Sequence, residues 1–300
     1  MRSPDADAGR GVSGTRRRLG SDWPRQPRRR RAVTILVVAG NAIRRLWRSR
    51  LLMVTGIIAL LIIGLMSSPI VFISVAQEAG EFQQAQQAAV GVLFFIAMLM
   101  GWFASLVALL IGVTITRQEI RDGTIFGLLA KPIARWEYLV GNYLGSLGYL
   151  LLIWAILGAI YVGLVSLTGQ SWSMSHSMML LGRLALSVLV LSLAFGLAQG
   201  LSMGAAAVLT LVIYNGELLV KGLTQLLSLV EVTLPDAVTR AMSYPFPATG
   251  GLDALFQSVL EVPLDAPPVG WVFLHLVDYS IAALLVGWWA FRRRDLATAD

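Results

Sequence analysis

Residues 117–145 have the sequence RQEIRDGTIFGLLAKPIARWEYLVGNYLG, a charged stretch between two long uncharged apolar runs. Of the 300 residues, 56% are hydrophobic and only 14% are charged, whereas a soluble domain averages about 25% charged residues. The composition therefore predicts a protein made mostly of membrane-spanning segments. The stretch 117–145 is then one of the few places where such a chain meets water and a partner protein.

Apolar length predicts six membrane-spanning helices, since about 20 apolar residues cross the hydrocarbon core. The expected spans lie near residues 51–73, 90–116, 138–168, 179–198, 203–221 and 271–291. The apolar run 179–213 is too long for one crossing at about 1.5 Å per residue, so we divide it at residues 199–202. The predicted fold class is an all-α, polytopic membrane protein.

The distribution of Lys and Arg predicts that both termini are cytoplasmic. With six spans, the inside segments 1–50, 117–137 and 292–300 hold 14, 4 and 3 of these residues, which is 21 of the 24 in the chain. The outside loops together hold only Arg240. This asymmetry agrees with the positive-inside rule and predicts a multi-pass protein of the plasma membrane.

Three segments outside the spans have their own patterns. Residues 1–32 are Arg-rich with almost no apolar content, so they are predicted to be a disordered cytoplasmic tail that lies on anionic lipid rather than on a specific nucleic acid. The rest of the chain, 33–300, is the predicted transmembrane domain, and it opens with an interfacial helix at 33–50. In 222–270, prolines interrupt short apolar stretches, which predicts short helices at the outer leaflet before the last span.

The motifs of several enzyme classes are missing from the sequence. It has no G-x-x-x-x-G-K-[ST] phosphate loop, no G-x-S-x-G elbow and no H-E-x-x-H zinc motif. There is no cysteine, and the only histidines are His176 and His275. We therefore predict no catalytic, cofactor-binding or metal-binding site in this chain and do not expect it to be an enzyme by itself.

Four charged residues fall inside the predicted spans: Arg183, Glu217, Lys221 and Asp278. A charge in hydrocarbon costs roughly 3 kcal/mol on insertion scales, so such residues usually face the bundle interior or a partner. Glu217 and Lys221 have the i, i+4 spacing of a helical ion pair. Two interpretations stay open. The four residues line the outer part of a substrate path, or the cations snorkel while the acids pair structurally.

Two glycine patterns predict close helix packing. They are Gly141-x-x-x-Gly145 at the start of the third span and Gly196-x-x-x-Gly200-x-x-x-Gly204 at the break between the fourth and fifth. Small residues at this spacing let helix backbones approach each other. We expect them to serve packing inside the bundle rather than to mark a dimer face.

Within 117–145, residues 118–130 mix apolar and charged side chains in the manner of a short amphipathic helix on the inner membrane surface. Lys131-Pro132 is expected to end it, because proline disfavours the helical conformation in the residue before it. Pro132 also suits the first turn of the next helix.

This stretch resembles the inner-loop motif of the ABC-2 type permeases, the membrane subunits of type V ABC exporters, particularly the branch of the nitrous-oxide-reductase maturation permease. The matching positions are Glu119, Gly123, Thr124, Leu128, Leu129, Lys131, Pro132, Arg135, Gly141, Tyr143, Leu144 and Gly145. Asn142 stands where that family often has lysine. The ending 291–296, a basic cluster followed by Asp-Leu, is also similar to the close of that family, and the likeness covers about residues 33–296.

The resemblance implies a permease subunit that couples ATP hydrolysis to substrate export. Two permease copies, identical or different, would pair in the membrane lipid, and a separate ATPase subunit would bind ATP and Mg²⁺. The segment 117–131 would be the coupling helix. The residues then expected to serve ATPase coupling are Glu119, Arg121, Asp122, Gly123, Thr124, Lys131, Pro132 and Arg135.

Two other functions stay open. A secondary transporter would need several charges at the membrane midplane and internal repeats, whereas the deep charges here are few and the two halves show no clear symmetry. A membrane scaffold without transport activity would not need the motif at 119–145. An ATPase bound to the purified protein would distinguish the ABC permease from both, and no residue indicates the substrate.

Overall fold

The computed structural model describes residues 28–49, 56, 57, 61, 64, 68, 82–121, 134–230, 234–247, 249 and 269–293. All regular structure in these residues is helical, which confirms the predicted fold class for the described part of the chain. The helices are α1 (Arg28–Arg48), α3 (Phe82–Arg121), α5 (Arg135–Leu167), α6 (Met174–Ala198), α7 (Met203–Tyr214), α8 (Gly216–Ser228), α9 (Asp236–Ser243) and α11 (Val269–Arg293).

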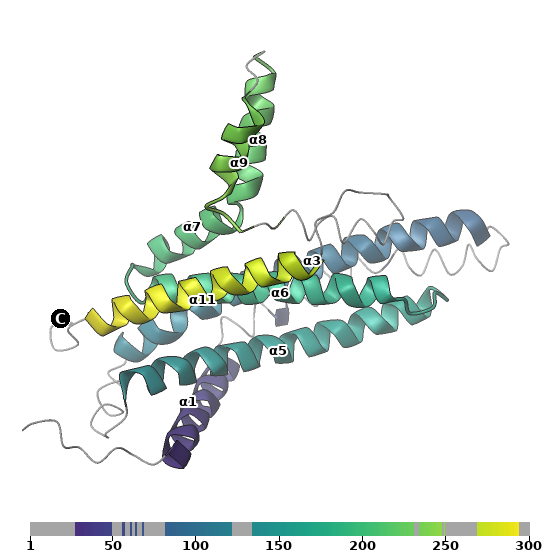
Figure 1. Cartoon of the computed structure of the whole chain (residues 1–300). Helices are drawn as coiled ribbons and strands as arrows, with labels where there is room; N and C mark the ends of the chain where they lie inside the picture. The colour runs from purple at the N-terminus through teal and green to yellow at the C-terminus, as the bar shows by residue number, and fades with distance from the viewer. Residues whose placement is uncertain are drawn as a thin grey trace, which may run out of the picture.

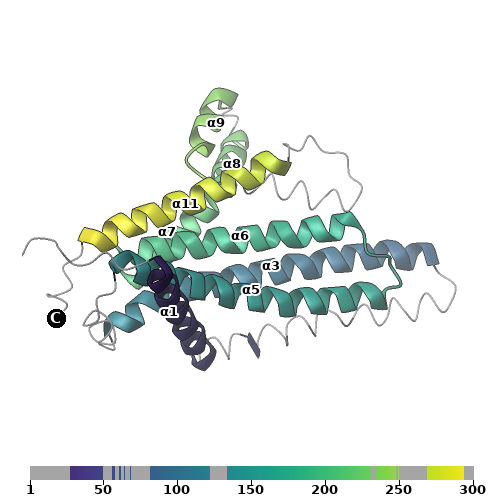
Figure 2. The same ribbon diagram turned by 60° about the horizontal axis from the view of Figure 1, so that its bottom comes forward.

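Helices α3, α5, α6 and α11 run side by side as a bundle (Figures 1 and 2). Helix α6 is its centre, because it packs on α3, α11, α5 and α7. Its buried side chains include Leu189, Leu191 and Phe195, and the facing side of α3 buries Ile96, Met100 and Ile111.

Four described helices are long and apolar enough to cross a membrane: α5, α6, α3 over residues 88–115, and α11 over residues 270–293. They correspond to the predicted second, third, fourth and sixth spans. The predicted first span, 51–73, lies almost entirely outside the described residues, so the count of six stays a prediction.

The predicted fifth span, 203–221, is not one straight helix. Helices α7 and α8 meet at Asn215 with a bend of 61°, and together they could form one broken span. Asn-Gly is a turn-forming dipeptide, and Gly216 lies against the ring of Phe246 with no space for a side chain. Helices α8 and α9 pack on each other and project from the bundle (Figure 1).

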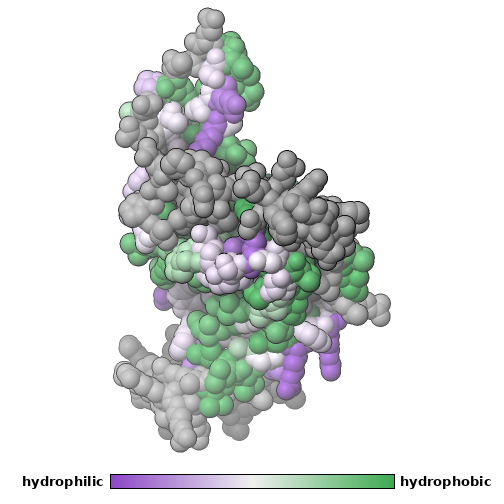
Figure 3. Space-filling view, turned by 90° about the vertical axis from the view of Figure 1, so that its right-hand side faces the viewer, coloured by the Kyte–Doolittle hydropathy of each residue, from purple (hydrophilic) through white to green (hydrophobic). Residues whose placement is uncertain are grey.

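The projecting helix α8 is amphipathic. Glu217, Lys221, Thr224 and Ser228 recur along one side, while Leu218, Leu219, Leu223 and Leu226 are exposed on the rest of its surface. Figure 3 shows hydrophobic residues along one edge of this projection with hydrophilic residues beside them. A helix of this kind suits a membrane interface, although its position at the outer leaflet stays a prediction.

Several helices begin before their predicted limits, including α6, which starts at Met174, and also α1 and α3. Helix α1 begins at Arg28, inside the tail predicted for 1–32, because arginine is a good helix former; residues 1–27 lie outside the described part. Helix α3 begins at Phe82, inside the predicted outer loop 74–89. Residues 82–89 contain only Phe, Gln and Ala, so nothing there interrupts a helix.

Candidate functional site

The segment that carries the permease motif joins two described helices at one end of the bundle. We call this the connecting end: the C-terminal end of α3, the N-terminal end of α5 and the C-terminal end of α11. Asp122, Gly123, Thr124, Lys131 and Pro132 lie outside the described residues. For Glu119 and Arg121 the structure gives the backbone in the last turns of α3, and Arg135 is the exposed first residue of α5.

Helix α3 reaches the motif without a break. The sequence predicted that the second span ends near Thr116 and that a separate amphipathic helix follows. Instead, α3 continues to Arg121, and residues 113–121 contain neither glycine nor proline. The Thr114 hydroxyl is satisfied within the helix, since it donates to the Leu110 carbonyl at 2.6 Å. The first residues of the predicted coupling segment, 117–121, therefore continue helix α3.

The start of α5 is fixed to the end of α11. Arg135 Nη1 donates to the Arg292 carbonyl oxygen at 3.4 Å, and the rings of Tyr138 and Phe291 stack with centroids 6.1 Å apart. Glu137 is buried, and its Oε2 accepts from the Ala134 N–H at 3.4 Å. These contacts order the first turn of α5, and a displacement there would reach α11 as well.

Helix α1 packs across α5 through the first glycine pair (Figure 2). A Cβ atom at Gly145 would lie 2.6 Å from the Ala42 Cβ, and one at Gly141 would lie 2.7 Å from the Val38 Cβ. The two backbones can touch only because both positions are glycine. This confirms that the pattern serves packing inside the chain. Asn142, where the resembling family often has lysine, is buried beside this contact.

Arg183 lies between α3 and α6. Its side chain is only 5% exposed and runs along Gly101, where a Cβ atom would lie 2.5 Å from the Arg183 Cδ. One turn further on, the hydroxyls of Ser105 and Ser187 are 3.4 Å apart. The missing side chain at Gly101 thus makes an interior slot for the arginine, and the snorkelling interpretation of its charged end stays a prediction.

Glu217 and Lys221 form the predicted ion pair on α8, with Oε1 and Nζ 2.7 Å apart. Lys221 is 62% exposed and Glu217 is largely covered. The Thr249 hydroxyl also donates to Glu217 Oε2 at 3.5 Å. The pair belongs to the projecting part of the molecule rather than to the bundle.

Asp278 occupies an exposed position of α11 beside the exposed Val277 and Ile281. His275 stacks on Trp271 and meets Tyr279 edge-on, each with ring centroids 4.9 Å away. Of the four intramembrane charges, the structure thus brings together only Glu217 and Lys221. Arg183 and Asp278 lie on other helices, so these residues do not form one cluster within this chain.

Sequence analysis missed two features of the site region. The bend at Asn215 was detectable from the Asn-Gly dipeptide that follows an apolar run. The pairing of Gly101 with Arg183 was not detectable, because no local pattern links a glycine in one span to an arginine in another. Within the described residues, no group of three or more His, Asp or Glu side chains is placed to hold a metal ion.

The chain matches the family model of ABC-2 family transporter proteins over residues 36–262, which is more than half of its length. No curated protein matches it significantly. The matched region includes α3, the motif segment, α5, α6 and the bent pair α7–α8. The chain therefore belongs to the ABC-2 family of transporter proteins, as the multi-pass membrane permease of an ABC transporter, which implies an ATPase partner.

Proposed function

We propose that this permease couples ATP hydrolysis by a separate ATPase subunit to substrate export, and that residues 117–131 are its coupling segment. The observation that carries the proposal is the unbroken helix α3, which runs from Phe82 to Arg121 and ends in the first residues of the motif. Because the chain has no phosphate-binding loop, ATP and Mg²⁺ bind in the partner.

The contacts at the connecting end support a mechanical role. A push on 122–133 would act on the end of α3 and the start of α5, which are both packed helices. Helix α3 lies against α6, and α5 lies against α1 and is tied to α11 through Arg135 and Tyr138. Close-packed interiors deform little, so the displacement would move whole helices against each other, as in other helix-shift transitions.

Orientation and assembly complete the proposal. The positive-inside count supports a cytoplasmic location for the connecting end and both termini, on the side where the ATPase would bind. A second permease copy, identical or different, pairs with this one in the membrane. The motif at 119–145 is our reason for placing the chain in the branch of the nitrous-oxide-reductase maturation permease.

The test is ATPase stimulation in proteoliposomes that contain the permease and its co-purified ATPase. Glu119→Ala removes an expected polar contact, and Gly123→Trp fills the turn that seats the coupling segment. We expect each to lower the stimulated rate about tenfold or more, since losing one charge-assisted hydrogen bond costs about 1.5–3 kcal/mol. Insertion and expression of the permease should not change.

The matched controls are Glu81→Ala and Gly270→Trp, which make the same changes at the opposite end of the predicted topology. Gly270 has open space beside it. If the Glu119→Ala and Gly123→Trp variants both stimulate the ATPase normally, residues 117–131 are not the coupling segment. If no ATPase co-purifies with the wild-type protein, the coupling proposal itself fails.

A further inference from the structure

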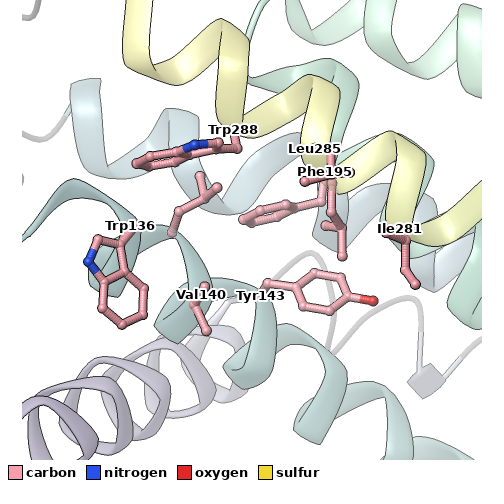
Figure 4. Close-up of a pocket in the computed structure, with 9 residues that line it drawn as sticks. Trp136, Val140, Tyr143, Phe195, Ile281, Leu285 and Trp288 are labelled. Atoms are coloured by element: carbon pink, nitrogen blue, oxygen red, sulfur yellow. The ribbon is translucent and has the colours of Figure 1, made fainter. Parts of the chain in front are cut away.

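A cavity of about 330 Å³ lies between α5 and α11 and is also lined by Phe195 of α6 (Figure 4). Its walls are aromatic and aliphatic, with Trp136 and Tyr143 from α5, Phe195 from α6 and Trp288 from α11. The Tyr143 hydroxyl is already hydrogen-bonded to the Ser192 hydroxyl at 2.8 Å. The volume is in the range of small-molecule pockets, and the interior offers a ligand mostly apolar contacts.

The cavity opens sideways, toward the membrane. It lies between α5 and α11, which are both long and apolar enough to cross a bilayer. Leu285 on its α11 side is 61% exposed and Val140 on its α5 side is 36% exposed. A lipid chain can therefore enter from the bilayer without crossing the bundle.

One end of this groove is basic. Figure 4 shows Trp136 and Trp288 at the same end, with Ile281 at the other. Arg135 precedes Trp136, and Arg292 follows Trp288 by one helical turn, which places both on the same face of α11. Arg135 Nη1 contacts the Arg292 carbonyl oxygen at 3.4 Å.

The arginines at this end are exposed on the surface. The side chains of Arg292 and Arg293 are exposed, and Arg293 lies 3.8 Å over the Trp289 ring. The one acidic side chain among the described residues here, Glu137, is buried and accepts from the N-terminus of α5. Tryptophan and arginine together are typical of the level of the lipid headgroups.

We infer that this groove binds an anionic phospholipid, with one acyl chain between α5 and α11 and the phosphate held by Arg135 and Arg292. Arginine forms strong charge-assisted hydrogen bonds to phosphate. A second copy of the chain would bring a like-charged rim to this one, which is unfavourable. The inference requires membrane insertion but not coupling to an ATPase, so it can fail or hold independently of the function proposed above.

The experiment is native mass spectrometry of the full chain, with any partner that co-purifies, in the presence of equal amounts of phosphatidylglycerol and phosphatidylcholine. We expect preferential retention of phosphatidylglycerol. In Arg135→Gln/Arg292→Gln the preference should fall about fivefold for each arginine, as expected for a basic residue at an anionic membrane surface. Lys221→Gln removes an exposed cation from the projecting helix α8, where Glu217 already neutralises it, and should leave the preference unchanged.

A second variant tests the groove itself. Val140→Trp fills the cavity from its exposed side and should displace the retained lipid, while a photoactivatable phosphatidylglycerol should cross-link to α5 and α11 in the wild-type chain only. Glycerol phosphate, the headgroup without chains, should not compete. Equal retention of the two lipids, unchanged binding by Val140→Trp, competition by glycerol phosphate, or loss of the oligomer in Val140→Trp would each overturn the inference.

Discussion

Helices α6 and α7 follow one another in the chain and are both strongly apolar, yet they have opposite environments. In the most apolar 18-residue segment of α6, 67% of the residues are buried within the chain. In the corresponding segment of α11, only 17% are buried. Helix α7 resembles α11 in this respect, since it buries only Ala206 and Thr210. Hydropathy alone therefore does not distinguish a helix that packs inside the chain from one that presents its side chains to lipid or to another subunit.

Matched small residues make the difference. Gly196 of α6 lies directly against the Ala283 carbonyl of α11, and Gly287 approaches Gly196 in return. On the other side of α6, Ala194 fills the space left by Gly112 of α3. In the membrane there is no hydrophobic force between helices, so close backbone contact must supply the packing energy. The exposed surface of α7, in contrast, carries bulky residues such as Val208 and Leu211.

The strongest test of this contrast is to introduce the same large side chain into α6 and into α7. Gly196→Leu would force the α11 backbone away from α6 and should abolish a monodisperse folded protein, since overpacking typically costs about 1–3 kcal/mol even without a backbone collision. Gly204→Leu, at the start of α7, meets open space and should fold normally. Size-exclusion profiles and thermal unfolding of the two variants would measure the effect. Equal losses would show that α7 is also covered within the chain.

Removing one basic side chain from each region should give the second largest difference in thermal stability. Arg183→Ala would leave a cavity beside Gly101, and large-to-small core changes cost about 2–5 kcal/mol. Lys221→Ala removes an exposed partner of Glu217, and such surface pairs are worth about 0–1 kcal/mol. Thermal unfolding in the same detergent compares the two.

Arg183→Met keeps most of the volume and therefore separates lost packing from lost charge. If it is as unstable as Arg183→Ala, the guanidinium group stabilises the α3–α6 contact. If it restores stability, Arg183 stabilises the fold only through its volume, and its charge is left for a role in transport. A loss in Lys221→Ala equal to that in Arg183→Ala would mean that α8 is buried by another subunit.

The location of the long apolar helices was predictable from composition, whereas the helix ends and the bend were predictable only in part. Apolar runs of about 20 residues located α3, α5, α6 and α11, because hydrocarbon thickness fixes helix length. Helix ends were less accurate: α3 extends from Phe82 to Arg121 because polar residues such as glutamine continue a helix beyond the membrane. The apolar run 203–221 predicted one span, whereas the Asn-Gly dipeptide at Asn215 favours the bend that the structure shows.

The candidate site was predictable only where the sequence carries a short motif. The glycine pair Gly141 and Gly145 predicted close packing, which the structure shows between α1 and α5, and the i, i+4 spacing predicted the Glu217–Lys221 pair. The slot for Arg183 and the groove between α5 and α11 depend on residues far apart in the chain, which only the packed structure brings together.

The smallest expected effects concern two tyrosine hydroxyls. Tyr143 bonds Ser192 at 2.8 Å inside the bundle, whereas Tyr279 donates to the Tyr244 carbonyl at 3.0 Å and ties α11 to the turn after α9. Hydrogen bonds between membrane helices average about 0.6 kcal/mol. Tyr143→Phe should therefore lower the Tm slightly and leave α8 and α9 unchanged.

Tyr279→Phe should have the opposite effects: it should leave the Tm nearly unchanged and loosen the projecting helices. The projecting pair α8–α9 makes few other contacts with the bundle, so losing this bond should speed amide hydrogen exchange in residues 236–247 with little change in Tm. Hydrogen-exchange mass spectrometry of both variants measures the two effects side by side. If Tyr279→Phe leaves exchange unchanged while Tyr143→Phe increases it, the projection is held by the bundle or by a second copy rather than by this bond. The distinction between a self-packed α6 and a loosely tied α7–α9 would then apply only to the isolated chain.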